Sequence, residues 1–290
     1  MKVLVVGATG LLGGETCERL IARGEEVRAM VRPTSDPGRV EWLRQLGAEL
    51  VTADLKDRPS VDRACRGVDS VVSTAIGVSQ RQPGDSVESV DLGGHLSLVA
   101  AATAAHVRRF VYVSFTAYRV EKIAFPYRDA KREVEKAIQA SGLEYTILRP
   151  TFFMETWVGP DEGFNSPDPA WTIYGAGENK VTWISRHDVA EFAVQTLLSP
   201  RGRNRVLELG GPEALSPRET IRIFERVTGK KFQVKSIPEE ALLREPANAL
   251  AVCFARGDEV SMTDTLREFP VKLTTVEDHA RAMAASSRKQ

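Results

Sequence analysis

Short apolar runs and amphipathic stretches alternate along the first half of the chain. The opening run, Met1 to Val6, is apolar and β-branched, which is typical of a buried strand. Apolar residues then recur at helical spacing, at Leu11, Leu12, Cys17, Leu20 and Ile21. The alternation of strand and helix continues to about residue 150, which predicts parallel strands joined by helical crossovers.

Further apolar runs predict strands at Glu26–Val31, Glu49–Ala53, Val68–Ser73, Phe110–Ser114 and Tyr145–Leu148. Amphipathic stretches predict the helices between them, and three of these begin with proline signals at Asp36-Pro37, Arg58-Pro59 and Pro126. One long helix is expected over Val87–Ala105. The whole pattern predicts an α/β fold with a doubly wound parallel sheet.

A change of composition near residue 155 predicts a smaller C-terminal lobe. The stretch Glu155 to Asn179 is rich in Gly, Pro, Asp and Trp, and predicts irregular structure. The later predicted elements are Lys180–Ile184, Val189–Leu198, Val206–Leu209, Ser216–Val227, Phe232–Ile237 and Thr275–Ala284. We expect domains at 1–154 and 155–290, with the strand near 180–184 and the helix 187–198 packed on the first domain.

Composition and charge exclude several classes of protein. The 39 basic and 39 acidic side chains cancel, which disfavours nucleic acid or an anionic membrane as the principal partner. Three widely spaced cysteines, Cys17, Cys65 and Cys253, argue against a disulfide framework or a zinc site and fit a reducing cytoplasm. The longest apolar run, Leu96 to Ala105, is about half a membrane span. We expect a soluble cytoplasmic protein.

Three glycines follow the first predicted strand at a spacing that suits a phosphate-binding turn. Gly7 permits the tight turn, Gly10 allows close approach of a phosphate, and Gly13 lets the helix pack near the strand. The free N–H groups of the helix start would then face the diphosphate of a dinucleotide. The residues expected to contact it are Gly7, Thr9, Gly10, Leu11, Leu12 and Gly13. A structural turn without a ligand is the alternative.

The second predicted strand ends at Arg32, about 20 residues past the glycines, where the adenosine ribose lies in dinucleotide folds. A guanidinium there would pair with a 2′-phosphate, so the sequence favours NADP(H) over NAD(H). Asp54 and Leu55 end the third strand and are expected near the adenine. Arg32 as an ordinary solvated arginine and Asp54 as a turn former remain open alternatives.

Small and polar residues end the next two predicted strands. Those expected to lie close to the cofactor are Thr74, Ala75 and Ile76. Ser114 ends the following strand, at the same edge of the sheet. The lone histidines His95 and His106 are interpreted as surface or packing residues, and no metal site is predicted.

Together these motifs resemble the short-chain dehydrogenase/reductase superfamily, and within it the atypical NmrA-like NAD(P)-binding branch. The resemblance covers roughly residues 1 to 235 and is carried by the glycine turn, Asp54-Leu55, Ser114, Tyr127 to Lys131 and Arg149-Pro150. It implies a Rossmann-type sheet, a bound nicotinamide dinucleotide and often a reductase activity.

The resemblance implies catalytic roles for Lys131, Tyr127 and Ser114. Tyr127 and Lys131 are four residues apart, so they share one face of a helix that begins at Pro126, whereas Arg132 points away from its apolar stripe. Lys131 would bind the nicotinamide ribose and lower the pKa of Tyr127, which would donate a proton while Ser114 holds the substrate carbonyl. A solvated Lys131 and a Tyr127 that only packs are the alternatives. Tyr127 follows Ser114 by thirteen positions, a shorter spacing than in well-characterised extended members.

The sixth predicted strand is followed by residues that the resemblance places against the nicotinamide: Pro150, Thr151, Phe152 and Phe153. The aromatic pair would form an apolar wall, although it could equally be core. The C-terminal lobe carries few polar groups in its expected lining, which suggests an uncharged or aromatic substrate.

The sequence therefore predicts an NADPH-dependent reductase that transfers hydride to a carbonyl or an activated double bond of a small apolar molecule, as a monomer or homodimer. The main alternative is a non-catalytic NADP(H)-binding sensor or assembly factor that acts through a protein partner. A sugar-nucleotide epimerase or dehydratase is disfavoured by the short spacing before Tyr127.

Overall fold

The computed structural model describes residues 1–77, 82–116, 122–244 and 248–287. The chain divides into two compact units. The first unit consists of Met1–Ser114, Pro126–Arg149 and Val189–Leu207, and the second of Phe115–Phe125, Pro150–Asp188 and Glu208–Gln290.

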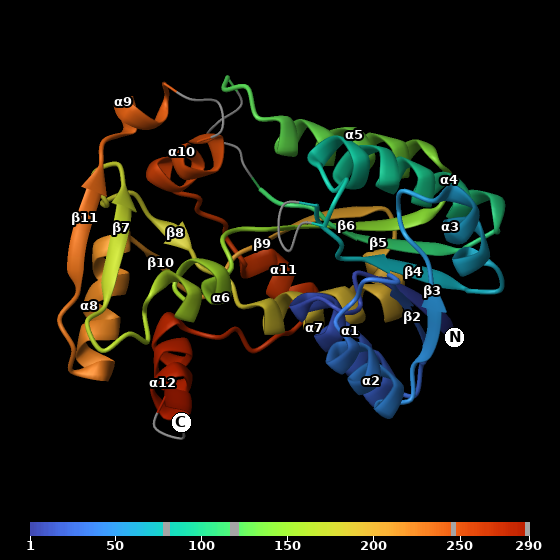
Figure 1. Ribbon diagram of the computed structural model, residues 1–290, viewed down its shortest axis with the longest axis horizontal. Helices are drawn as coiled ribbons and strands as arrows, with labels where there is room; N and C mark the ends of the chain where they lie inside the picture. Colours follow the sequence, from blue (N-terminus) through green and yellow to red (C-terminus); the bar gives the residue numbers. More distant parts are fainter. Residues whose placement is uncertain (78–81, 117–121, 245–247, 288–290) are drawn as a thin grey trace. The chain divides into compact units, whose positions relative to one another are not determined.

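A seven-stranded sheet with the order β3-β2-β1-β4-β5-β6-β9 forms the centre of the first unit (Figure 1). Its strands are β1 (Lys2–Val6), β2 (Glu26–Val31), β3 (Glu49–Thr52), β4 (Ser70–Ser73), β5 (Arg109–Val113), β6 (Glu144–Pro150) and β9 (Arg205–Leu209). Every neighbouring pair from β3 to β6 is parallel. The order of the strands turns back between β1 and β4, as in a doubly wound fold: β2 and β3 lie on one side of β1, and β4, β5 and β6 follow on the other. The predicted Rossmann-type sheet is confirmed.

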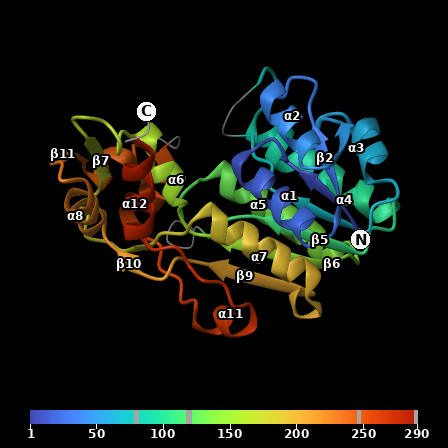
Figure 2. The ribbon, with the colours of Figure 1, turned by 90° about the horizontal axis from the view of Figure 1, so that it is seen from below.

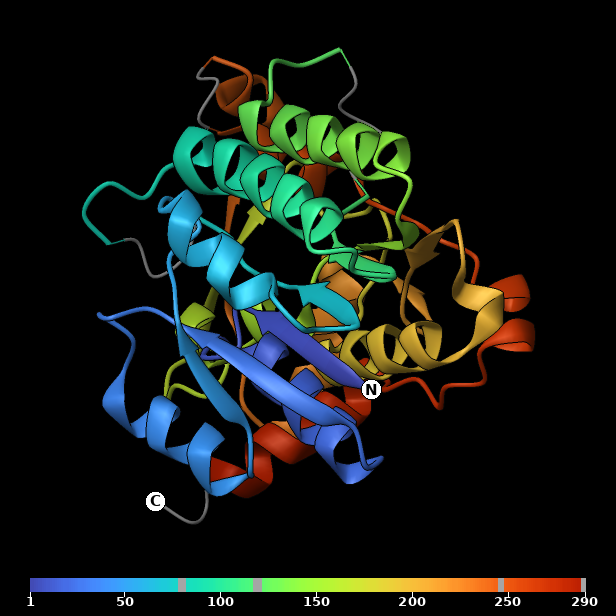
Figure 3. The ribbon, with the colours of Figure 1, turned by 90° about the vertical axis from the view of Figure 1, so that its right-hand side faces the viewer.

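Helices cover both faces of this sheet (Figure 3). One face carries α3 (Arg58–Cys65), η1 (Val87–Gly94), α4 (His95–Ala104) and α5 (Pro126–Ala140). The other carries α1 (Leu11–Ala22), α2 (Pro37–Gln45) and α7 (Arg186–Leu198). With both faces covered, a central strand such as β5 is buried at every position.

One helix of this unit differs from the expectation. The predicted single helix Val87–Ala105 is a π-helix, η1, that continues as the α-helix α4. A Cβ on Gly94 would lie 2.8 Å from Cβ of Leu55, so the close packing at this junction requires glycine. The widened turn matters because it positions a buried carboxylate, Asp91, described below.

Local capping explains several helix starts. The side chain of Asp36 accepts a hydrogen bond from the backbone N–H of Arg39 at the start of α2, 2.8 Å away. At the start of α8 (Pro217–Thr228), Ser216 and Glu219 form a reciprocal capping box. Each of these contacts joins residues three apart in the sequence.

The second unit contains two small sheets, six α-helices and one 3-10 helix among its described residues (Figure 2). β7 (Ala170–Tyr174) pairs in parallel with β11 (Gln233–Ile237), and β8 (Val181–Thr182) pairs antiparallel with β10 (Ala214–Leu215). The helices are α6 (Met154–Trp157), η3 (Pro160–Glu162), α8, α9 (Glu239–Leu242), α10 (Ala249–Arg256), α11 (Thr263–Glu268) and α12 (Val276–Ser287), η3 being a 3-10 turn. The expectation of irregular structure over Glu155–Asn179 is wrong at β7, because β11 supplies a distant pairing partner that local composition does not reveal.

Aromatic side chains form the core of the second unit. Phe152, Trp157, Trp171, Trp183 and Phe254 contact one another, with ring centroids 5.1 to 6.3 Å apart. Across the residues that the structure describes, no helix is long and apolar enough to span a membrane. The three cysteines are buried, and none of them is in a disulfide.

Candidate functional site

The glycine turn after β1 has the geometry that binds phosphate groups in other proteins. Gly7 has a φ of +86°, which side chains rarely adopt. A Cβ on Gly13 would lie 2.1 Å from the carbonyl oxygen of Gly7, so glycine is required there as well. At Gly10, by contrast, a Cβ would meet only the Gly7 carbonyl oxygen, at 3.2 Å.

The start of α1 is open for a ligand. Its N-cap residue is Gly10, and no side chain caps it. The helix dipole and the unused N–H groups therefore favour an anion here. Leu11 beside this turn is 57% exposed, and Ile76 after β4 is 41% exposed. These features fit a large ligand with a diphosphate and apolar rings.

Neighbouring residues support the turn in different ways. Thr74 Oγ1 donates to the carbonyl of Val6 at 3.2 Å, and an added Cβ at Gly7 would lie 2.8 Å from that hydroxyl and 2.9 Å from the backbone nitrogen of Ala75. Arg39 reaches from α2 and donates to the carbonyls of Thr9 and Gly10, each 3.2 Å away. Sequence reasoning missed Arg39, whose only local signal was its place in a helix.

The residues at the ends of β2 and β3 are already paired. Arg32 Nη1 donates to Asp85 Oδ2 at 2.8 Å. Asp54 accepts from the backbone N–H of Lys56 at 2.9 Å, which is the turn-forming geometry left open above. Leu55 is buried in the hydrophobic core, with 6% of its surface exposed.

Lys131 is fully buried in the first unit. Its Nζ lies 3.8 Å from Asp91 Oδ1, donates to the carbonyl oxygen of Val113 at 3.4 Å, and lies 4.9 and 5.5 Å from the ring centroids of Tyr112 and Tyr127. The alternative of a solvated lysine is therefore wrong. Val113 is the last residue of β5, so the ammonium lies at the carboxyl edge of the sheet.

Burial controls the protonation of Lys131. It lowers the pKa of Lys131 to about 8, against the opposing influence of Asp91 and Glu135. A lysine with such a pKa exchanges its proton readily near neutral pH. Asp91 Oδ2 accepts from the backbone N–H of Gly77 at 3.1 Å, so the carboxylate links the lysine to the loop after β4.

Tyr127 does not have the acidity that the resemblance implied. Burial and the charge of Asp91 raise the pKa of Tyr127, so the expectation that Lys131 lowers it is wrong for this structure. The ammonium lies over the face of the ring, where it attracts the π electrons. Tyr127 is half-buried and shares the helix face with Lys131, as predicted.

His95 and Tyr112 complete the buried surroundings of Lys131. Both nitrogens of His95 have partners, Ser73 Oγ and the carbonyl of Val90, each 2.9 Å away. Burial and then the nearby Lys131 charge lower the pKa of His95 to about 3, so the ring is neutral. This histidine is a satisfied core residue, as interpreted from the sequence.

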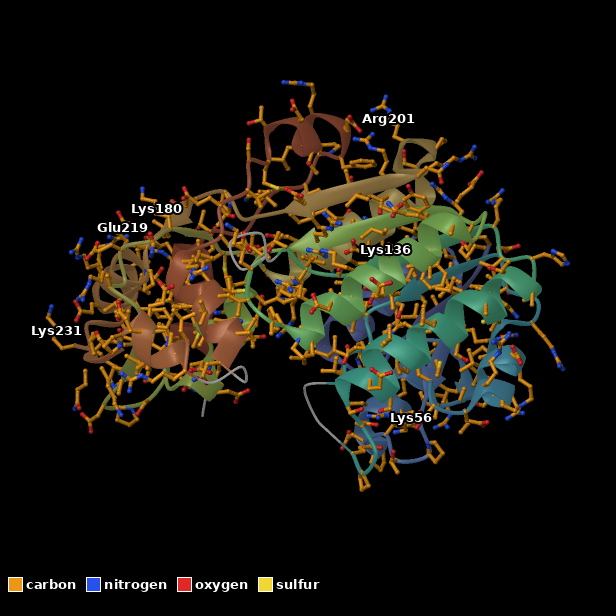
Figure 4. The ribbon with its side chains drawn as sticks, turned by 90° about the horizontal axis from the view of Figure 1, so that it is seen from above. Lys56, Lys136, Lys180, Arg201, Glu219 and Lys231 are labelled. Atoms are coloured by element: carbon orange, nitrogen blue, oxygen red, sulfur yellow. The ribbon has the colours of Figure 1, made fainter. Side chains whose placement is uncertain are left out.

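Ser114 belongs to a different polar network. Its Oγ accepts a hydrogen bond from Arg132 Nη1 at 3.2 Å, and the same arginine pairs with Glu135 at 2.7 Å. Glu135 also accepts from Arg149 Nη2 at 2.5 Å. The expectation that Arg132 points away is wrong, because its long side chain curls back toward the end of β5. Lys136, one turn along, does point outward (Figure 4).

The predicted nicotinamide wall lies in the second unit. The backbone N–H of Thr151, which follows Pro150, donates to the carbonyl of Leu209 at 2.9 Å. Phe152 packs edge-on against Trp157 and Phe254. The N–H of Ile184 donates to the carbonyl of Phe152 at 3.1 Å, and Phe153 forms a β-bridge with Ile184. In the structure this segment is part of that unit's core.

The fold and the site define a Rossmann-type α/β protein with an uncapped glycine turn and a buried lysine at the carboxyl edge of its sheet. The chain belongs to the NmrA-like family, whose model matches residues 1–277. The family predicted from the sequence motifs is thereby confirmed.

The curated relatives of the chain include proteins named as assembly factors and proteins named as reductases. It is 30% identical to photosystem II assembly factor Ycf39 of Trieres chinensis, over 82% of this chain and 72% of that protein. It is 29% identical to isoflavone reductase homolog IRL of Zea mays, over 96% of each.

Among solved structures, the chain is similar to one described as "AtPrR2 with NADP+ and (+)pinoresinol". The TM-score is 0.78 at 25% identity, over 97% of this chain and 98% of the other. That structure contains NADP+ and (+)pinoresinol.

Proposed function

We propose that this chain is an NADPH-dependent reductase that transfers hydride to a carbonyl or an activated double bond of a small, largely apolar substrate. The proposal is supported by membership of the NmrA-like family and by a relative, matched over 96% of its length, that is named as an isoflavone reductase homolog. A structural neighbour that contains NADP+ and pinoresinol supports it further. The observation that carries the proposal is the buried Lys131, with a pKa of about 8, at the carboxyl edge of a Rossmann-type sheet.

The coenzyme contacts follow from the open features of the first unit. The amides of the glycine turn would hold the diphosphate, with Gly7, Thr9, Gly10, Leu11, Leu12 and Gly13 contributing. Thr74, Ala75 and Ile76 would flank it, Arg32 would bind the 2′-phosphate, and Asp54 with Leu55 would shape the adenine end. A bound nicotinamide coenzyme supplies the hydride.

Lys131 has the chemistry to complete such a reduction. An ammonium with a pKa near 8 both donates hydrogen bonds to ribose hydroxyls and releases a proton near neutral pH. Tyr127, whose pKa is raised, stays a neutral phenol that donates a hydrogen bond and orients the acceptor. Arg132 donates to Ser114 Oγ, which leaves the hydroxyl proton of Ser114 for an acceptor such as a substrate carbonyl.

In this proposal, residues 155–290 bind the substrate. The aromatic residues of this part of the chain, among them Trp171, Trp183 and Phe254, make it strongly apolar, which suits an uncharged or aromatic substrate. The protein acts as a monomer or homodimer in the cytoplasm, and neither nucleic acid nor a membrane is its partner.

A second candidate function is supported by the assembly-factor relative. In that case the chain binds NADP(H) but acts through a protein partner, and Lys131 serves only to hold the coenzyme. Both functions require coenzyme binding, so turnover distinguishes them.

The test is NADPH oxidation against quinones, aldehydes, ketones and enones. Lys131→Met should lower turnover at least about 100-fold, because the proton donor is lost. The double variant Lys131→Met/Asp91→Asn avoids an unpaired buried carboxylate and should show the same loss. Lys136→Met, which changes an exposed lysine of the same helix, should keep wild-type rates. Tight NADPH binding without any turnover would favour the assembly factor.

A further inference from the structure

The carboxylate of Asp85 lies between two cations at the expected 2′-phosphate position. Its Oδ2 accepts from Arg32 Nη1 at 2.8 Å, and its Oδ1 accepts from Lys56 Nζ. The backbone N–H of Gln82 donates to Oδ2 at 3.1 Å and fixes the carboxylate further. Asp85 is only 3% exposed, whereas Arg32 and Lys56 are 30% and 26% exposed.

One small anion therefore bridges two basic side chains from different loops. A phosphate presents oxygens at a spacing similar to that of a carboxylate, and binds Arg and Lys by the same charge-assisted hydrogen bonds. Any anion that takes the position of the Asp85 carboxylate meets both cations at once. Lys56 also lies 3.6 Å from Asp54, so two acids already offset the two cations.

We propose that the Asp85 carboxylate occupies the place of the coenzyme's 2′-phosphate and that Lys56, beside Arg32, is the second cation of this phosphate site. Because Asp85 competes with the phosphate for both cations, it limits the preference of the protein for NADPH over NADH. The inference rests on the proposed function, because it specifies how the same coenzyme is selected. Asp85 acts as an internal competitor that must leave both cations before the phosphate binds.

The strength of the existing contacts supports this competition. Although burial raises the pKa of Asp85, the hydrogen bonds from Lys56 and Arg32 bring it down to about 2, so the group is an anion throughout the neutral range. A coenzyme with a 2′-phosphate must break these contacts and form its own. NADH has no such phosphate, so it leaves the Asp85 contacts in place.

The experiment measures the dissociation constants of NADPH and NADH by calorimetry for four variants. Asp85→Asn should tighten NADPH binding about five- to tenfold, because the competing charge is removed and the shape is kept. Lys56→Gln should weaken NADPH binding about tenfold. Neither change should alter NADH binding more than about twofold. Adenosine 2′,5′-bisphosphate and AMP should repeat the contrast without the nicotinamide.

Two matched controls test whether position matters. Asp62→Asn removes an exposed carboxylate that pairs with Arg58 on α3. Lys136→Gln removes an exposed lysine that pairs with Glu133, and Figure 4 shows this lysine and Lys56 on separate parts of the first unit. Neither control should change the ratio of the two dissociation constants.

Opposite results would overturn the inference. If Asp85→Asn leaves NADPH affinity unchanged or weakens it, the carboxylate orients the cations and does not compete. If Lys56→Gln weakens NADPH and NADH equally, Lys56 is no phosphate ligand. Both results would leave the proposed function intact, whereas a wild-type protein that binds neither coenzyme would refute that function itself.

Discussion

Replacement of Asp91 by asparagine tests the electrostatics of the buried lysine. Asparagine keeps the size of the side chain and can still accept the hydrogen bond from Gly77 N–H, but it removes the negative charge 3.8 Å from Lys131 Nζ. With an effective dielectric constant of about 20, that distance corresponds to an attraction of about 4 kcal/mol. The pKa of Lys131 should therefore fall further below 8 in the variant.

The consequence for stability depends on pH. In the folded wild type the pKa of Lys131 lies below its ordinary value of 10.5. Between about pH 8 and 10.5 the unfolded chain therefore binds more protons than the folded protein. The free energy of unfolding that this group contributes rises with pH across that range. In Asp91→Asn the same rise begins at a lower pH. The variant should therefore be less stable than wild type by about 2 to 4 kcal/mol at pH 6, and by less at pH 8.5.

The assay is urea unfolding of both proteins at several pH values from 6 to 9. Cys17 and Cys65, whose burial raises the pKa of each thiol to about 12, lower stability in the alkaline part of this range. They do so equally in both proteins, so the difference between the proteins isolates the lysine. A stability deficit that is the same at every pH, or no deficit at all, would refute the reasoning.

Three further predictions concern local features. Gly13→Ala should destabilise the first unit by about 1 to 3 kcal/mol in thermal unfolding, since the new Cβ would lie 2.1 Å from the Gly7 carbonyl oxygen; wild-type stability would contradict this. Ser216→Ala should cost about 1 kcal/mol in urea unfolding by removing half of the capping box of α8, and Ser216→Thr should restore it. Cys17 and Cys65, with thiol pKa values of about 12, should resist a thiol reagent at pH 8 until urea unfolds the chain, and rapid labelling of the native protein would show that they are accessible.

Sequence reasoning succeeded where the physical cause lies within a few residues. The glycine turn follows from backbone limits at Gly7 and Gly13, and the helix starts follow from side chains that bond to amides three positions later. Lys131 and Tyr127 share a face because they are four residues apart. The doubly wound parallel sheet follows from the alternation of strands and helices along the chain.

The partners of these residues could not be read from local patterns. Asp85 lies 53 positions from Arg32, and only the folded chain brings its carboxylate to that guanidinium. Asp91 occupies a π-helical turn that helical periodicity does not distinguish from an ordinary helix. The curl of Arg132 toward Ser114 depends on rotamers, which spacing on a helical wheel does not determine.

The same limit explains the incorrect prediction for Tyr127. Proximity to a lysine suggested a lowered phenol pKa, but the burial of the ring and the charge of Asp91 act in the opposite direction. Burial is a property of the whole fold, so it could not be inferred from the four-residue spacing between Tyr127 and Lys131.

Calorimetric titration of NADPH into wild type and Gly10→Val tests the central claim most directly. A Cβ at position 10 meets only one backbone oxygen of the fold, at 3.2 Å, so the larger side chain should be tolerated by the protein but should block the diphosphate. We expect wild type to bind one NADPH per chain, and the folded variant to bind none. Equal binding by both proteins, or no binding by the wild type, would contradict the claim that a dinucleotide lies over the glycine turn.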